Sequence, residues 1–98
     1  MADEKFRIKE NSWLAALAAR RLRSSRMAMV IGSTIHLHNC SRQQLLDNER
    51  WLRHELCHIR QYRRYGLLRF IALYLWESMR RGYYHNKFEV EARQAENL

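Results

Sequence analysis

The order of apolar and polar residues predicts a helix close to the start of the chain. Apolar residues recur there at helical spacing, behind a possible N-cap at Asn11 or Ser12, at the positions Trp13, Leu14, Leu17 and Leu22. Arginines at 20, 21 and 23 suit the C-terminal end of such a helix, where the backbone carbonyls favour positive charge. We expect this helix to be a structural support.

Two short strands are predicted next, over residues 27–31 and 34–39, with Gly32 in the first place of a two-residue hairpin turn. A lone hairpin is not stable in water, so these strands are expected to pack on the helices. His36 and His38 share one face of the second strand. Such a pair can bind metal, but on an edge strand we expect it to face solvent or a substrate groove.

The main helix is predicted over residues 48–65. Ser41 has capping-box spacing for a short helical turn before it, Asp47 can cap its N-terminus, and Gly66 is a suitable stop.

Two more helices follow in the predicted order. The helix over 67–81 is apolar on most of its circumference, so it is expected to be buried or to cover a partner, and Gly82 ends it. The last helix starts near Asn86. The chain has no proline, no internal repeat and no low-complexity linker, so we expect one α+β domain over residues 1–98.

The main helix carries the run His54-Glu55-Leu56-Cys57-His58. Residues four apart on a helix lie one turn above each other, so the two histidines present their imidazoles to one point, which suits a single Zn²⁺ ion. Glu55 lies about 100° around the helix from His54, close enough to reach a water molecule at the metal as a general base. Cys57 points away and is interpreted as a small, partly buried spacer.

The hairpin, the motif helix and the later run from Asn86 to Ala92 together resemble the zincin metallopeptidases of the gluzincin type. More narrowly, residues 35–91 are similar to small bacterial zincin-like proteins. The resemblance implies a minimal zincin-like domain in which a glutamate on the last helix is the third zinc ligand. Glu89-x-x-Ala92 matches the stretch that carries this ligand, so Glu89 is the implied residue, with Glu91 as the alternative. Without a metal, Glu89 would instead complete a cap at Asn86.

Three protein ligands leave one position open, as in catalytic zinc sites. The resemblance implies peptide-bond hydrolysis, in which zinc activates a water and polarises the scissile carbonyl while Glu55 accepts the proton and passes it to the leaving amine. His85 and Tyr84 are the preferred donors to the developing oxyanion, ahead of Tyr83 and Arg93. The resemblance also makes residues 34–39 the strand that pairs with an extended peptide or protein substrate.

Two functions therefore stay open. The first is a zinc metallopeptidase, which Glu55 favours because a purely structural site has no use for a carboxylate there. The alternative is a catalytically inactive, zinc-stabilised binding module that uses residues 67–76 as its contact surface. The short chain favours the alternative, because it leaves no second domain to wall a substrate cleft.

Composition adds limits to these hypotheses. The net charge of +8 suits a solvated basic surface, nucleic acid or anionic lipid, but the arginines are dispersed and no recognition fold accompanies them, so nucleic acid is not the expected partner. The apolar stretch 70–76 is far shorter than the ~20 residues of a membrane span. No secretory signal follows the charged N-terminus, so we expect a cytoplasmic location. Cys40 and Cys57 are too few for a disulfide framework.

Overall fold

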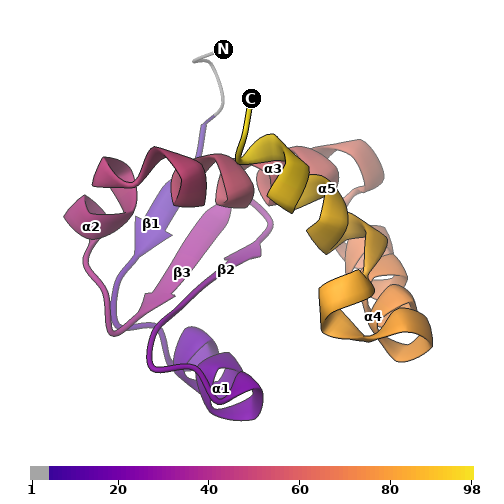
Figure 1. Ribbon diagram of the computed structural model, residues 1–98, viewed down its shortest axis with the longest axis horizontal. Helices are drawn as coiled ribbons and strands as arrows, with labels where there is room; N and C mark the ends of the chain where they lie inside the picture. The colour runs from indigo at the N-terminus through magenta and orange to yellow at the C-terminus, as the bar shows by residue number, and fades with distance from the viewer. Residues whose placement is uncertain (1–4) are drawn as a thin grey trace.

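The structure is a computed structural model that describes residues 5–98. Within them the chain forms an α+β fold with a three-stranded mixed sheet and five helices (Figure 1). The elements in chain order are β1 (Arg7–Lys9), α1 (Trp13–Leu22), β2 (Met27–Ile31), β3 (Thr34–His38), α2 (Arg42–Asp47), α3 (Glu49–Tyr65), α4 (Leu67–His85) and α5 (Lys87–Ala95).

The predicted hairpin is confirmed, but β3 is the central strand of the sheet and not an edge strand. β2 pairs with it in antiparallel register, with Val30 opposite Ile35, and β1 pairs with its other side in parallel register, with Ile8 opposite Ile35. The prediction that residues 34–39 pair with substrate is therefore wrong, because both sides of this strand already have partners. Among residues 5–98, the free edge beside the hairpin belongs to β2.

The core lies between the sheet and the helices that cover it. Alternation along β3 turns Ile35 and Leu37 into this core, where both are fully buried. Val30 of β2 joins them, and the helices supply the other buried members of the cluster, namely Leu45, Ile59, Tyr62, Phe70 and Phe88. Burial of this apolar surface is the main term that stabilises the fold and holds α3 against the strands.

Alternation turns His36 to the other face of β3. Its Nδ1 lies 2.8 Å from the hydroxyl oxygen of Ser12, the buried N-cap of α1. Burial lowers the pKa of His36, and the positive charge of Lys9 acts in the same direction. His36 thus anchors the start of α1 and lies outside the metal cluster described below.

The helix caps agree with the predictions, apart from one position. Ser41 and Gln44 form the expected capping box of α2. The residue that caps α3 is Asn48, whose side chain accepts from Trp51 N at 3.1 Å, and not Asp47, which lies inside the last turn of α2. The predicted cap was wrong by one residue because α2 runs directly up to α3.

Helix α4 is more exposed than its composition suggests. Gly82 has non-helical angles with φ +80°, so the regular helix breaks where predicted and one further turn leads to α5. Only Phe70 and Glu77 are fully buried, whereas Leu68 and Met79 are each 81% exposed. The helix is therefore buried on one face, where Phe70 and the partly buried Ile71, Leu73 and Tyr74 pack on the core, and exposed on the other. In residues 5–98, no helix is long and apolar enough to cross a bilayer.

Candidate metal centre

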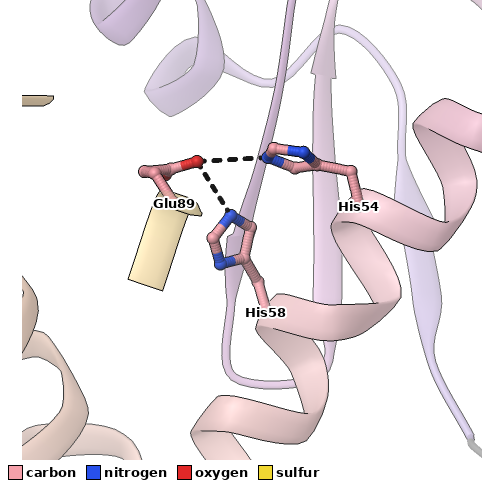
Figure 2. A group of neighbouring side chains, drawn as sticks. All are labelled: His54, His58 and Glu89. Carbon is pink, nitrogen blue, oxygen red and sulfur yellow. Dashed lines mark hydrogen bonds and ion pairs between the residues drawn. The ribbon is translucent and has the colours of Figure 1, made fainter. Parts of the chain in front are cut away.

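Three predicted ligands meet between α3 and α5 (Figure 2). Nε2 of His54 lies 3.1 Å from Oε1 of Glu89, and Nε2 of His58 lies 3.3 Å from the same oxygen. One donor atom from each residue falls within 4.8 Å of the others, and the set is placed to hold a metal ion. The convergence of Glu89 with the two histidines is confirmed.

The antiparallel packing of α3 and α5 produces this meeting. Cys57 is buried against Ala92 and Ala95 of α5, facing away from the imidazoles. One turn further along α3, the side-chain amide of Gln61 donates to the backbone carbonyl of Phe88 at 3.1 Å. These contacts bring Glu89 opposite the histidine face of α3, and Cys57 is a spacer, as predicted, although more deeply buried than expected.

The far side of each imidazole also has a partner. Nδ1 of His54 lies 2.8 Å from Oε2 of Glu96, and Nδ1 of His58 lies 2.8 Å from Oε1 of Gln61. The amide nitrogen of Gln61 donates to Glu91 at 2.7 Å, which fixes its oxygen toward His58. Each Nδ1–H therefore has an acceptor. In the neutral form of each ring, the lone pair of Nε2 then points at the space between His54, His58 and Glu89, where an ion would bind.

Glu91 is thereby excluded from the cluster, because its carboxylate is bound to Gln61. Gln61 therefore orients the imidazole of His58 without being one of the three ligands. The part played by Glu96 was missed. It lies two turns after Glu89 on the same helix face, and this spacing was the available signal.

Glu55 lies beside the cluster and is 3% exposed. Its Oε1 has no hydrogen-bond partner among residues 5–98, and the side chain lines the same cavity as the three ligands. Burial raises the pKa of Glu55 to about 7, while the charges of His58 and His54 act in the opposite direction. A buried carboxyl oxygen without a hydrogen-bond partner destabilises the fold, so the position of Oε1 in this cavity indicates a chemical role for Glu55.

The charges of the cluster are strongly coupled. Burial lowers the pKa of His58, but hydrogen bonding to Glu89 and the negative charges nearby outweigh burial and raise that pKa to about 9. The pKa of His54 is raised for the same reasons. Burial would raise the pKa of Glu89, yet its bonds to both histidines hold that pKa far below its usual value. Without metal, the proton on the His58 nitrogen that faces Glu89 is therefore held more tightly than in a free imidazole.

The donor set fits a zinc ion. Tetrahedral ligands at zinc bond lengths of about 2.0–2.1 Å lie about 3.3 Å apart, close to the two separations from Glu89 Oε1. Two imidazole nitrogens and one carboxylate oxygen are ligands that zinc accepts, and fewer than four protein ligands leave a position open. The chemistry of the donors agrees with a zinc site, while the geometry alone defines a metal site of unspecified identity.

Two tyrosines share the cavity with these residues. Tyr74 of α4 donates its hydroxyl to Oε2 of Glu89 at 2.5 Å, and burial followed by the charge of Glu89 raises the pKa of this phenol far above its usual value. Tyr83 lines the same cavity, and burial likewise raises its pKa. The cavity measures about 370 Å³, and β2, α1 and α4 supply most of its apolar wall.

The predicted oxyanion donors lie elsewhere. Tyr84 and His85 are exposed and absent from the cavity lining. Arg93 covers the ring of Tyr84 at 4.1 Å and donates to its backbone carbonyl. In the turn after Gly82, Tyr83 lines the cavity but Tyr84 and His85 do not, so the structure brings neither of these two residues to Glu89. Tyr74 was missed because its apolar neighbours indicated a core position.

The start of α5 is fixed by buried polar contacts with α4. Asn86 is fully buried, and its Oδ1 accepts from Phe88 N at 2.8 Å. Its amide nitrogen donates to the backbone of Tyr74 at 3.0 Å and to Ser78 Oγ at 2.9 Å. The side chain of Glu89 bonds the histidines and does not complete a cap at Asn86.

Comparisons of the chain with protein families, curated proteins and solved structures found no match. The assignment of function therefore depends on the geometry of the cluster and on the motif that supplies it.

Proposed function

We propose that this protein is a zinc-dependent hydrolase of the zincin type that cleaves peptide bonds. The observation that carries the proposal is the position of Glu55, a buried carboxyl with one oxygen that has no hydrogen-bond partner among residues 5–98, beside three converging metal ligands and in the same cavity. A structural metal site gains nothing from such a carboxyl, whereas a general base belongs there.

In this proposal, different residues bind the ion, orient the imidazoles and transfer the proton. His54, His58 and Glu89 hold the ion, while Glu96 and Gln61 orient the two imidazoles. When bound, zinc supplies a Lewis acid that acidifies water and polarises a carbonyl. Glu55 accepts the proton of the attacking water and returns it to the leaving amine, a role suited to its raised pKa of about 7.

Tyr74 and Tyr83 replace Tyr84 and His85 as the proposed oxyanion donors. Both line the cavity that contains Glu55 and the ligands, and a phenol with a raised pKa keeps its proton for hydrogen bonding. Tyr83 has the freer hydroxyl, because the hydroxyl of Tyr74 is committed to Glu89.

The substrate strand is assigned to β2 in place of β3. The strand Met27–Ile31 lines the cavity and has one strand neighbour among the described residues, so an extended peptide can add to its other side. The cavity wall next to it is largely apolar, and this favours peptides with apolar side chains.

The test separates metal binding from turnover. Protein purified without added metal is analysed for bound ions and assayed on a casein-derived peptide library, in parallel with Glu55→Gln and His58→Ala. We expect His58→Ala to lose the metal, and Glu55→Gln to keep the metal but lose hydrolysis by at least about 10²-fold. Equal hydrolysis by the native chain and Glu55→Gln would identify the activity as a contaminant.

The second candidate function is an inactive, zinc-stabilised binding module. The exposed apolar residues of α4 favour it, since they form an unpartnered surface outside the metal site. This function is indicated if zinc binds with the expected residues and raises the stability, while no peptide in the library is cleaved.

A further inference from the structure

Helix α4 presents a continuous apolar stripe to solvent. Leu68, Ala72, Leu75 and Met79 follow one another at intervals of four, three and four residues, so they share one face, and all four are exposed. Trp76 borders this face and is 57% exposed. The buried residues Phe70 and Glu77 lie on the opposite side, so the stripe points away from the domain.

Positive charge borders the stripe along one flank. Arg69 and Arg80 each follow a stripe residue directly, lie eleven residues apart and so share a side of the helix. Both are exposed, and neither forms an ion pair with an acidic side chain of residues 5–98. The one acidic residue of α4, Glu77, is buried and bonds Lys87 N and Arg81. No negative charge of α4 itself therefore opposes an anionic partner.

The stripe continues toward the mouth of the cavity. Leu75 of α4 and Leu22 of α1 both line the cavity, and they are still 55% and 46% exposed. Figure 1 shows α4 on the side of the domain away from β1, next to α5, with which it packs. The apolar stripe of α4 and the mouth of the cavity thus form one continuous apolar surface.

We propose that this protein docks on the surface of an anionic lipid bilayer through α4. The leucines, methionine and tryptophan enter the headgroup boundary, and Arg69 and Arg80 extend to the lipid phosphates. The helix lies in the plane of the surface and does not cross it. The net charge of +8 strengthens attraction to anionic lipid and opposes the pairing of two copies through this stripe. Docking is independent of the metal and of hydrolysis.

The test uses the full chain and vesicles of phosphatidylcholine, with or without phosphatidylglycerol, at physiological salt. The native chain is expected to co-sediment with the anionic vesicles and to bind neutral vesicles far more weakly. Met79→Glu should weaken binding about tenfold or more, because it removes an inserted side chain and adds a negative charge. Replacing Arg69 and Arg80 with Gln should weaken it about fivefold for each residue.

Leu98→Glu is the matched control for Met79→Glu. Leu98 is 87% exposed at the C-terminus, so the control has the same charge change at a similarly exposed apolar residue. If Met79→Glu does not fold by circular dichroism, Leu68→Ser tests the same stripe.

Three results would overturn the proposal. The first is the absence of binding to anionic vesicles. The second is an equal effect of Met79→Glu and Leu98→Glu, which indicates adsorption by net charge alone. The third is a dimer in sedimentation equilibrium that Met79→Glu dissociates while vesicles are not bound, which assigns the stripe to a second copy.

Discussion

Glu96 lies 2.8 Å from Nδ1 of His54, while Glu89 lies 3.1 Å from Nε2 of the same ring. One imidazole is thus held between the carboxylate of Glu89 on α5 and that of Glu96 at the C-cap of this helix. The carboxylate of Glu96 is itself positioned by Arg50 at 3.3 Å, and its backbone carbonyl accepts from Arg53 at 2.8 Å. This arrangement orients a metal ligand from its far side.

Glu96→Ala should therefore lower the zinc affinity by about 10–100-fold, because Nδ1 of His54 loses its acceptor. Glu96→Gln should recover most of the affinity, since an amide oxygen also accepts this bond. Competition with a chelator of known affinity measures both variants. Glu49→Ala is the control, because Glu49 bonds Arg53 at the exposed surface. Native affinity in Glu96→Ala would show that this contact does not position the ring.

The same measurement of zinc affinity can decide whether Glu89 or Glu91 is the third ligand. Glu89→Gln should weaken zinc binding by at least about 10²-fold, since it replaces the charged ligand that faces both histidines. Glu91→Gln should have a smaller effect, because Glu91 acts only through Gln61. A larger loss in Glu91→Gln than in Glu89→Gln would reverse the assignment of the third ligand.

The metal-free protein should lose stability as the pH rises from 6.5 to 9. His58 has a pKa raised from 6.5 to about 9, so its proton stabilises the fold fully below 6.5, and this stabilisation disappears as the pH passes 9. The expected loss is about 3 kcal/mol in the free energy of unfolding, from a shift of about 2.5 pH units at about 1.4 kcal/mol each. Glu55 acts in the same direction between pH 4.5 and 7, because burial disfavours its charged form.

Urea unfolding with a chelator present, over this pH range, measures the effect. His58→Ala should flatten the slope between 6.5 and 9, whereas His85→Ala should leave it unchanged, because His85 is exposed. Stability that is constant or rises with pH in the metal-free native chain contradicts the expected coupling. Zinc should bind more tightly as the pH rises, because it displaces these protons.

Asn86→Ala should destabilise the protein by about 2–3 kcal/mol. The variant loses the cap of α5 and leaves the carbonyl of Tyr74 without its amide partner. Since α5 carries Glu89, the zinc affinity should fall with it. Asn97→Ala, at an exposed position, provides the comparison in thermal unfolding and zinc titration. Equal stability of the two variants would show that the buried amide does not hold α5.

The sequence predicted the elements with local signals. Short-range interactions determine the helix caps at Ser12 and Ser41, the turn at Gly32 and the helix end at Gly66. The helices and the hairpin begin and end close to these residues. The metal ligands were also predictable, because helical spacing pairs His54 with His58 and the resemblance indicated Glu89.

Features set by distant contacts were not predicted. The strand Arg7–Lys9 is short and mostly charged, so nothing local indicates that it pairs with β3 and makes that strand central. The orientation of the turn after Gly82 likewise depends on tertiary packing, which places Tyr83 in the cavity lining and leaves Tyr84 and His85 outside it. The apolar composition of α4 could not distinguish a core helix from an exposed one.

The seam between α3 and α5 consists of small side chains, Cys57, Ala92 and Ala95. Burial raises the pKa of the Cys57 thiol, so it stays neutral and apolar at this contact. Small residues allow two helix axes to approach closely, and this separation decides whether a glutamate from one helix reaches two imidazoles on the other. The separation of the three candidate ligands is therefore set in part by the volume of three side chains that do not belong to the cluster. A larger side chain at this seam is expected to move Glu89 away from the two imidazoles.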